Sequence, residues 1–235
     1  MPFALLLLIF IAFSPFLSYA KELVMDSNNS HAIQIQKLPD DMNAAELLLP
    51  LQNDRVIGNK NANIIMIEYA SMSCLHCSSF NLHVMPKIKE KYIDTGKVLF
   101  IYRDFPFDYR SLKAAMLGFC YTDFDYFNYQ KAVFSSVDSW SSKPSDLGVL
   151  ENIAKISNIS TETFNKCINN EEVMNYIIQQ KFLATKQLMI GSTPTFFVNG
   201  KKIEGSKDFK FFAEMFDELI KNKPNYSPII IEEAK

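Results

Sequence analysis

The sequence predicts an α/β fold in which a helical domain interrupts the sheet-forming part of the chain. Two largely apolar runs, 64–70 and 98–102, are typical of strands buried on both faces of a sheet. A hairpin pattern over 195–204 comes only after a stretch, 110–187, with almost no strand pattern. The expected order is therefore strand, helix, strand, helical insert, hairpin and helix.

The first helix and the second strand complete a β-α-β unit. Residues 78–92 are mostly helix formers, and we expect Pro86 to kink the helix. The crossover from the strand at 64–70 to the strand at 98–102 is long enough to make the two strands parallel.

Local signals place the later elements. Asn170 precedes two glutamates, and a side-chain cap followed by negative charge favours a helix start there. Asn199-Gly200 lies between two strand patterns and predicts a tight hairpin. Residues 207–221 space their large apolar side chains as an amphipathic helix does.

Composition excludes several classes of function. The chain has 235 residues, 48% of them hydrophobic, and 24 Lys plus Arg against 26 Asp plus Glu. This is a globular composition without the basic excess that nucleic-acid binding needs, so we expect no nucleic-acid partner. None of the seven glycines lie at positions i and i+2, so the chain has no G-x-G nucleotide-binding fingerprint.

The first 20 residues resemble a secretory signal peptide. They carry no charged side chain, 16 of them are apolar, and Ser18-Tyr19-Ala20 puts small residues where a signal peptidase reads. We expect export and cleavage after Ala20; an uncleaved anchor and a buried core helix are the alternatives. Residues 21–63 are then an N-terminal lead-in, and residues 223–235, with two prolines, a C-terminal tail.

The chemistry is predicted at Cys74-Leu75-His76-Cys77, between the first strand and its helix. A C-x-x-C motif in a β-α-β pattern indicates a redox-active pair. Unpaired amides and the helix dipole at a helix N-terminus stabilise a thiolate, so we expect the pKa of Cys74 within about 3.5–7.5. His76 is expected to add a hydrogen bond or a positive charge, and Cys77, one turn further on, to be less exposed.

Two other interpretations of these cysteines stay open. The first is a structural disulfide without turnover. The second is a metal site formed by Cys74, Cys77, His76 and His83, although structural zinc sites usually draw on a second close cysteine pair. The remaining cysteines lie 47 residues apart.

Two separated segments carry a resemblance to a known family. They are residues 68–80, which contain the cysteine pair, and residues 191–200, which contain Thr193-Pro194. In this order they resemble the exported DsbA-family thiol oxidoreductases, over about residues 55–221, and specifically the alphaproteobacterial branch with a second cysteine pair. The resemblance implies a thioredoxin fold interrupted by a helical domain, with the thioredoxin-like domain at 64–109 and 188–222 and the inserted domain at 110–187.

The resemblance also implies roles for individual residues. Cys74 matches the family's attacking cysteine and Cys77 its buried partner. Pro194 matches a cis-proline, which keeps a backbone donor out of the site, and Thr193 can present its backbone to an extended substrate. Leu75 stands where the family often has proline, a departure that bears on the redox potential.

Glu68 is a carboxylate within an apolar strand, six residues before Cys74. Such a group is costly to bury unless it is paired or protonated. It is expected to accept a proton and tune Cys77, with Lys97 as its counter-charge by resemblance. The alternative is a salt-bridged residue at a strand edge.

Cys120 and Cys167 lie in apolar surroundings within the helical insert. An oxidising compartment favours a disulfide between them, and two inert buried thiols are the alternative. The aromatic cluster between them is expected to pack in the core rather than line a peptide groove: Phe119, Tyr121, Phe124, Tyr126, Phe127 and Tyr129.

These observations predict an enzyme, a periplasmic thiol:disulfide oxidoreductase that introduces disulfide bonds into exported proteins. Its partners would be newly exported polypeptides with reduced cysteines and, by resemblance, a quinone-coupled DsbB-like membrane protein that reoxidises it. No metal or organic cofactor is expected. The alternatives are a disulfide isomerase or reductase of the same fold and a non-enzymatic copper or zinc carrier.

Overall fold

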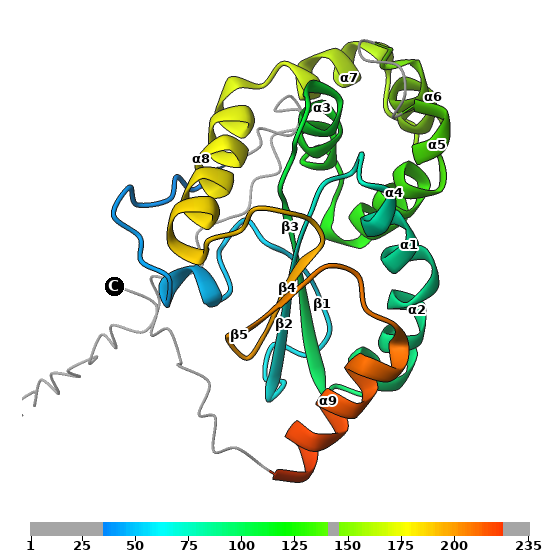
Figure 1. Ribbon diagram of the computed structural model, residues 1–235. Coiled ribbons are helices and arrows are strands. Elements are labelled where there is room, and N and C mark those ends of the chain that lie inside the picture. Colours follow the sequence, from blue (N-terminus) through cyan, green and yellow to red (C-terminus); the bar gives the residue numbers. More distant parts are fainter. Residues whose placement is uncertain (1–34, 141–145, 223–235) are drawn as a thin grey trace, which may run out of the picture. The chain divides into compact units, whose positions relative to one another are not determined.

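The computed structural model describes residues 35–140 and 146–222 and has a five-stranded sheet at its centre (Figure 1). The strands are β1 (Arg55–Ile57), β2 (Ile64–Ala70), β3 (Val98–Asp104), β4 (Thr195–Val198) and β5 (Lys201–Glu204). Their order across the sheet is β1-β3-β2-β4-β5. β2 and β3 pair in parallel, and every other pair is antiparallel.

The sequence predictions for the sheet are confirmed at its centre. All seven residues of β3 are buried, as are six of the seven in β2. Asn199 and Gly200 connect β4 to β5 with φ values of 45° and 82°, the positive pair that a tight hairpin turn requires.

The lead-in predicted over 21–63 contains a strand that the sequence pattern did not indicate. β1 lies antiparallel to β3, with Val56 opposite Ile101, and forms an edge of the sheet. Only three residues long and half-buried throughout, it is too short for a periodic pattern to develop.

Helices cover both faces of the sheet and the end at which β2 and β3 finish (Figure 1). Before the insert they are η1 (Glu46–Leu48), α1 (Leu75–His83), α2 (Met85–Ile88) and η2 (Lys89–Ile93). In the expected insert they are α3 (Tyr109–Gly118), α4 (Asp123–Ser135), α5 (Val137–Trp140), α6 (Gly148–Ile156), α7 (Thr161–Ile168) and α8 (Glu171–Leu188). The final helix is α9 (Phe209–Asn222).

The helices have the starts and breaks that their sequences favour. The side chain of Asn170 accepts a hydrogen bond from the Val173 amide at 3.1 Å and caps α8, as predicted. α1 ends at His83 and a new helix begins at Met85, directly before Pro86. The break agrees with the kink expected at that proline.

The two faces of the sheet pack against different helices and separate two cores. Cys77 of α1, Phe80 of α1 and Phe212 of α9 share one core with the face formed by Met66, Phe100 and Phe196. The other face packs on α8 and on part of the lead-in. A residue's position in the strand therefore decides whether it lies on the side of the cysteine pair.

A buried ion pair ties the lead-in to the sheet on the face away from the cysteines. Arg103 of β3 donates from Nε and Nη2 to the two carboxylate oxygens of Asp54, each at 2.8 Å, and neither side chain is exposed. The guanidinium also donates to the Tyr69 hydroxyl at 2.8 Å and to the carbonyl oxygens of Leu47 and Leu49. Every N–H group of the Arg103 guanidinium is thus directed at an acceptor.

The predicted signal peptide (1–20) and the tail (223–235) lie outside the described residues. Within the part that is described, no helix combines the length and the hydropathy of a membrane span.

Candidate functional site

Cys74 lies between the end of β2 and the start of α1, where it serves as the N-cap of that helix. Its backbone is extended, with φ −86° and ψ 117°, and its sulfur accepts a hydrogen bond from the Cys77 amide at 3.3 Å. Cys74 is half-buried and Cys77 is buried, and both are free thiols in the structure. The Cys74 sulfur is therefore partly open to solvent, and the Cys77 sulfur is not.

The surroundings of Cys74 favour its thiolate. A hydrogen bond from the Cys77 thiol is the largest cause that lowers the pKa of Cys74 to about 6, and partial burial opposes it. The Thr193 hydroxyl and the backbone amides of His76 and Cys77 lower this pKa further. The two backbone amides are the donors that a sulfur at a helix N-terminus is expected to meet.

Cys77 has the opposite character. Burial is the main cause that raises the pKa of Cys77 well above its usual value, and the nearby Cys74 sulfur and the Glu68 carboxylate add to the effect. Cys77 therefore stays protonated while Cys74 is ionised. Such an asymmetric pair separates one nucleophilic sulfur from one proton-holding sulfur.

Thr193 and Pro194 lie against the cysteine pair, and the peptide bond between them is cis. In its protonated form Cys74 donates from Sγ to the Thr193 carbonyl oxygen at 3.5 Å. The buried Thr193 hydroxyl has no hydrogen-bond partner in this geometry, yet it lowers the pKa of both cysteines. The Thr193 hydroxyl can therefore donate a hydrogen bond to a cysteine sulfur that carries negative charge.

Glu68 lies inside the protein beneath the cysteines. It is fully buried in β2 and accepts two hydrogen bonds from the Asn81 side-chain amide, at 2.9 Å and 3.2 Å. The same amide group donates to the Cys77 carbonyl oxygen at 3.0 Å. Burial raises the pKa of Glu68 well above its usual value, which Asn81 only partly offsets, and this shift favours the protonated carboxyl.

The prediction that Lys97 is the counter-charge of Glu68 is wrong. Lys97 is exposed and lies near the Tyr92 ring, 6.0 Å from its centroid. It precedes Val98, which pairs with Ile64, whereas Glu68 pairs with Tyr102 further along the same two strands. At about 3.3 Å per residue the two positions are more than about 13 Å apart.

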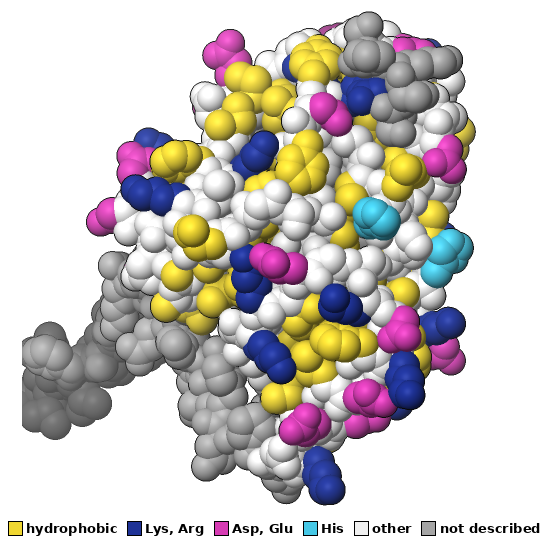
Figure 2. Space-filling model, in the orientation of Figure 1, with side chains coloured by type: hydrophobic (Ala, Val, Ile, Leu, Met, Phe, Trp, Pro, Cys, Tyr) yellow, Lys and Arg dark blue, Asp and Glu magenta, His cyan; other side chains and the backbone are white. Residues whose placement is uncertain are grey.

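Of the two effects expected from His76, the structure bears only on the hydrogen bond to Cys74. Its side chain is exposed, and among the described residues no hydrogen bond joins its imidazole to Cys74. Its backbone amide, not its ring, helps to lower the pKa of Cys74. Figure 2 shows histidine side chains at the surface over α1, with hydrophobic side chains beside them.

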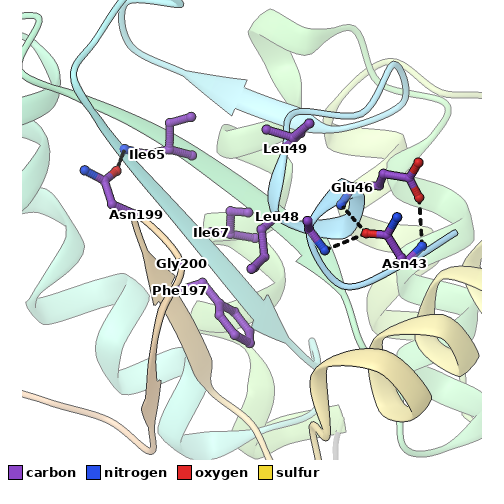
Figure 3. Close-up of a pocket in the computed structure, with 10 residues that line it drawn as sticks. Asn43, Glu46, Leu48, Leu49, Ile65, Ile67, Phe197, Asn199 and Gly200 are labelled. Atoms are coloured by element: carbon purple, nitrogen blue, oxygen red, sulfur yellow. Dashed lines mark hydrogen bonds between the residues drawn. The ribbon is translucent and has the colours of Figure 1, made fainter. Parts of the chain in front are cut away.

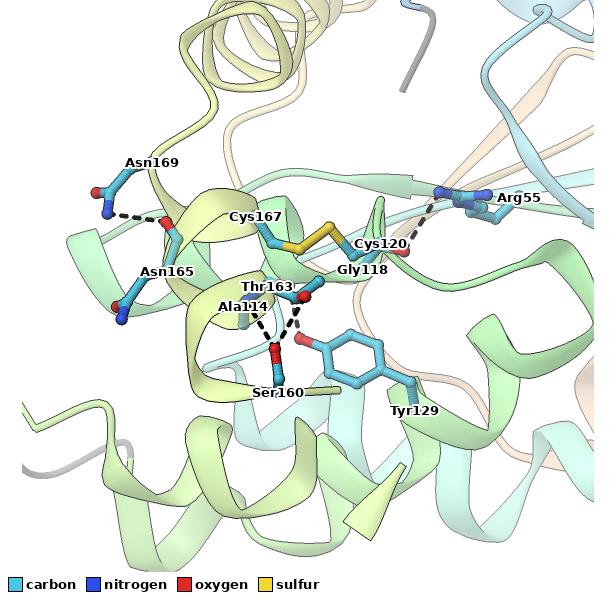
Figure 4. The surroundings of a disulfide bond; sticks show 10 residues. All are labelled: Arg55, Ala114, Gly118, Cys120, Tyr129, Ser160, Thr163, Asn165, Cys167 and Asn169. Atoms are coloured by element: carbon cyan, nitrogen blue, oxygen red, sulfur yellow. Dashed lines mark hydrogen bonds between the residues drawn. A yellow bond between two sulfur atoms is a disulfide. The ribbon is translucent and has the colours of Figure 1, made fainter. Parts of the chain in front are cut away.

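Cys120 and Cys167 form a disulfide in the structure, with their Cα atoms 6.1 Å apart (Figure 4). Cys120 follows α3 and Cys167 lies in α7, so the bond ties two helices of the insert together. A further contact joins the same helices, because the buried Lys113 ammonium donates to the Ile168 carbonyl oxygen at 2.5 Å. The bond and the lysine fix the position of α7 against α3.

The aromatic cluster of the insert is mostly core, as expected. Tyr126 and Tyr129 are almost fully buried, and Tyr121 stacks on Tyr129 with ring centroids 4.3 Å apart. Phe124 is the exception: it points outward and is 86% exposed.

A cavity of about 300 Å³ lies between η1 and the sheet, away from the cysteines (Figure 3). Its walls include Ile65, Ile67 and Phe197, which belong to the opposite face of the sheet from Glu68 and Cys77. It therefore has no part in chemistry at the cysteine pair.

Three residues of the site were missed by the sequence reasoning. Asn81 is four residues after Cys77 and so shares its side of α1, a spacing that could have identified it. Ser73 donates to Asp108 at 2.8 Å. That contact joins residues 35 apart in the chain and gives no local signal.

No group of three or more potential metal ligands comes together among residues 35–140 and 146–222. His83 is exposed at the end of α1, nine residues after Cys74.

Comparisons with known proteins agree with the geometry. A family model described as Thioredoxin matches residues 51–218. A "putative protein-disulfide oxidoreductase" of Rickettsia typhi is 30% identical over 184 residues, which cover 76% of this chain and 68% of the relative. A protein of the same description from Rickettsia prowazekii is 33% identical over 153 residues, which cover 65% of this chain and only 56% of the relative.

Comparison with solved structures also finds a similar protein whose name includes DsbA. The crystal structure of Wolbachia pipientis alpha-DsbA1 is similar with a TM-score of 0.73 and 50% sequence identity, covering 75% of this chain and 96% of that one. The family model matches more than half of the chain, and both the Rickettsia typhi and the Wolbachia proteins are covered over more than two thirds of their length. The chain therefore belongs to the DsbA family of thioredoxin-like oxidoreductases.

Proposed function

We propose that this protein is a dithiol oxidase that introduces disulfide bonds into exported proteins by exchange at Cys74 and Cys77. One observation carries the proposal: the pKa of Cys74 is lowered to about 6 while burial raises that of Cys77. A stable thiolate favours the reduced form of the enzyme, so its disulfide is a strong oxidant. The same asymmetry directs attack to the Cys74 sulfur.

The reaction has two exchange steps. A substrate thiolate attacks Cys74 in the enzyme disulfide, a mixed disulfide forms, and Cys77 leaves with the bond's electron pair and takes up a proton. A second substrate thiolate then attacks the substrate sulfur of the mixed disulfide and releases Cys74 as a thiolate. The substrate loses two electrons, and the enzyme holds them as a reduced cysteine pair until it is reoxidised.

We assign Glu68 the role of supplying the proton that Cys77 takes up. Burial raises the pKa of the Glu68 carboxyl and so favours its protonated form, and Asn81 donates both to it and to the Cys77 carbonyl oxygen. Burial excludes competing water, so a neutral acid is the available proton source on this side of the sheet. Asn81 holds the carboxyl in place.

Replacing Glu68 with glutamine is expected to change the pH dependence of exchange. The Glu68 carboxylate is one cause of the raised pKa of Cys77, so without its charge the pKa of Cys77 should fall and the alkaline limb of the profile should move to lower pH. Measuring exchange rates of Glu68→Gln across the pH range tests this. Glu90→Gln, at an exposed glutamate, is the control, and superimposable profiles for wild type and Glu68→Gln would reject the role.

Glu68→Gln should also change how the stability of the folded protein depends on pH. The pKa of Glu68 is higher in the folded than in the unfolded protein, so the folded protein binds the proton more tightly. Wild-type stability therefore falls as pH rises from the unfolded pKa, about 4.3, through the folded value. Denaturation of Glu68→Gln should lack that loss.

We place the reaction in the periplasm and assign the remaining roles there. Residues 1–20 are proposed to be a cleaved signal peptide, and a quinone-coupled DsbB-like membrane protein is proposed to reoxidise the enzyme. Thr193 and Pro194 are proposed to receive an extended substrate segment beside Cys74. The division into a thioredoxin-like domain (64–109 and 188–222) and an inserted helical domain (110–187) is part of the same proposal.

Alkylation of the protein taken directly from cells tests the function. After acid quenching, an oxidase should have Cys74 and Cys77 joined in a disulfide in most molecules, as read by mass spectrometry. A pair found mostly as free thiols would contradict the oxidase function and favour an isomerase or reductase. One metal ion per chain with no thiol exchange would favour a metal carrier.

A further inference from the structure

The loop that leads to Cys74 is fastened to the first helix of the insert through one hydroxyl group. Ser73, immediately before Cys74, donates from Oγ to the Asp108 carboxylate oxygen Oδ2 at 2.8 Å. The Ser73 and Ser71 hydroxyl groups are also within hydrogen-bond distance of each other, at 3.1 Å. The turn is closed by the Cys74 amide, which donates to the Ser71 carbonyl oxygen at 3.0 Å.

Asp108 is itself held rigidly. As the N-cap of α3 it accepts the Ser111 amide at Oδ1, at 2.8 Å, while its own amide donates to the Ser111 hydroxyl at 3.2 Å. This reciprocal pair is a capping box. Arg110 lies 3.7 Å from Oδ2. One oxygen therefore caps the helix and leaves the other directed at Ser73.

A carboxylate near a catalytic thiolate is unfavourable by charge alone, since a negative neighbour opposes ionisation of the thiol. Here the charge is partly balanced by the start of α3, by Arg110 and by the donated hydrogen bonds. Burial acts to raise the pKa of Asp108, but the Ser111 amide, the Ser73 hydroxyl and Arg110 outweigh it and the pKa is lowered. The group is thus an ionised, well-anchored acceptor.

The N-cap geometry of Cys74 depends on where this loop lies. The Cys74 sulfur is stabilised by groups that α1 and the loop before Pro194 position, including the Cys77 amide at 3.3 Å. Such hydrogen bonds weaken steeply as distance and angle change. Ser73 joins this loop to Asp108 at the start of α3.

We propose that Asp108 and Ser73 are positioning residues for the nucleophile: the Asp108 carboxylate holds the Ser73 hydroxyl and so fixes Cys74 at the N-terminus of α1. The proposal rests on the dithiol exchange proposed above. It gives the start of α3 a role in positioning the reactive sulfur, through a contact at the residue immediately before that helix.

Three variants separate positioning from charge and from helix capping. Ser73→Ala removes the hydroxyl without changing any charge. Asp108→Ser keeps a good N-cap for α3 but is too short to reach Ser73, and it also removes a negative charge. The double variant tests coupling. Thr122→Ala, which removes the N-cap of α4, the helix after α3, is the matched control for lost stability.

The readout is the pKa of Cys74 in the reduced, full-length protein, together with its rate of exchange. Ser73→Ala should raise this pKa by about half a unit to one unit, the size of one hydrogen bond. Asp108→Ser should raise it as well, and the double variant should match the single variants. Thr122→Ala should lower the melting temperature and leave the pKa unchanged.

Two results of these pKa measurements would overturn the proposal. An Asp108→Ser protein with a lowered Cys74 pKa would show that only charge acts there and would overturn the proposal. So would a Ser73→Ala protein whose pKa equals that of the wild type. Because the wild type is measured in the same assay, an inactive wild type would reject the proposed function, whereas an active wild type with an unaffected Ser73→Ala variant would reject this inference alone.

Discussion

Replacing Cys77 with serine is expected to stop oxidation of substrate dithiols and to leave Cys74 covalently bound to substrate. Without Cys77 the enzyme cannot form the disulfide that accepts electrons from a dithiol. Cys74 keeps its accessible sulfur, so its thiolate still attacks a substrate disulfide and displaces one substrate thiolate, and no second enzyme sulfur remains to resolve the mixed disulfide. Replacing Cys74 with serine removes the attacking sulfur and should prevent the mixed disulfide as well. We expect both variants to lose about 10³-fold or more in turnover.

Non-reducing electrophoresis and mass spectrometry distinguish the two variants. The Cys77→Ser protein should accumulate an adduct with a model peptide disulfide, and the Cys74→Ser protein should not. The double variant Cys120→Ala, Cys167→Ala is the control. In the unsubstituted protein these two sulfurs are bonded to each other in another part of the fold. Adduct formation through Cys77 in the Cys74→Ser protein would contradict the assigned roles.

Replacing Asp54 with alanine is expected to lower the free energy of unfolding by about 3–5 kcal/mol. The change leaves the Arg103 guanidinium buried without its carboxylate, and neither side chain of the pair is exposed to solvent. We expect the substitution to lower stability and to leave the reactivity of the cysteine pair unchanged. Arg103 lies next to Tyr69 on the face of the sheet away from Glu68 and Cys77.

Urea denaturation of the reduced protein measures this loss. Asp41→Ala, at an exposed aspartate in the same lead-in, should change stability by no more than about 0.5 kcal/mol. The pKa of Cys74 should be the same in both variants. A loss below about 1 kcal/mol for Asp54→Ala would mean that the pair does not fasten the lead-in to the sheet as described.

The sequence predicted what depends on local patterns. Continuous apolar runs predicted β2 and β3, Asn199-Gly200 predicted the hairpin, and the position of the C-x-x-C motif before a helix predicted the N-cap that Cys74 occupies. Each of these features is set by residues within about one turn or one strand of each other. The family resemblance added the thioredoxin fold and its helical insert.

What the sequence did not predict depends on contacts between distant segments. β1 exists because it pairs with β3, about 45 residues later in the chain, and three residues carry no periodicity. The partner of Glu68 is Asn81, a neutral amide, and not Lys97; only the register of β2 against β3 reveals that Lys97 is too far away. The link from Ser73 to Asp108 likewise joins two segments that are 35 residues apart in the chain.

The central claim is that the Cys74 sulfur is an anion at neutral pH in the reduced protein. Its most direct test is a pH titration of the thiolate by ultraviolet absorbance, with the Cys74→Ser variant subtracted to isolate the signal. The account predicts a single ionisation with a pKa of about 6. A value near the ordinary cysteine pKa of about 8.5 would contradict it, because the reduced form would then have no thiolate to stabilise it at neutral pH.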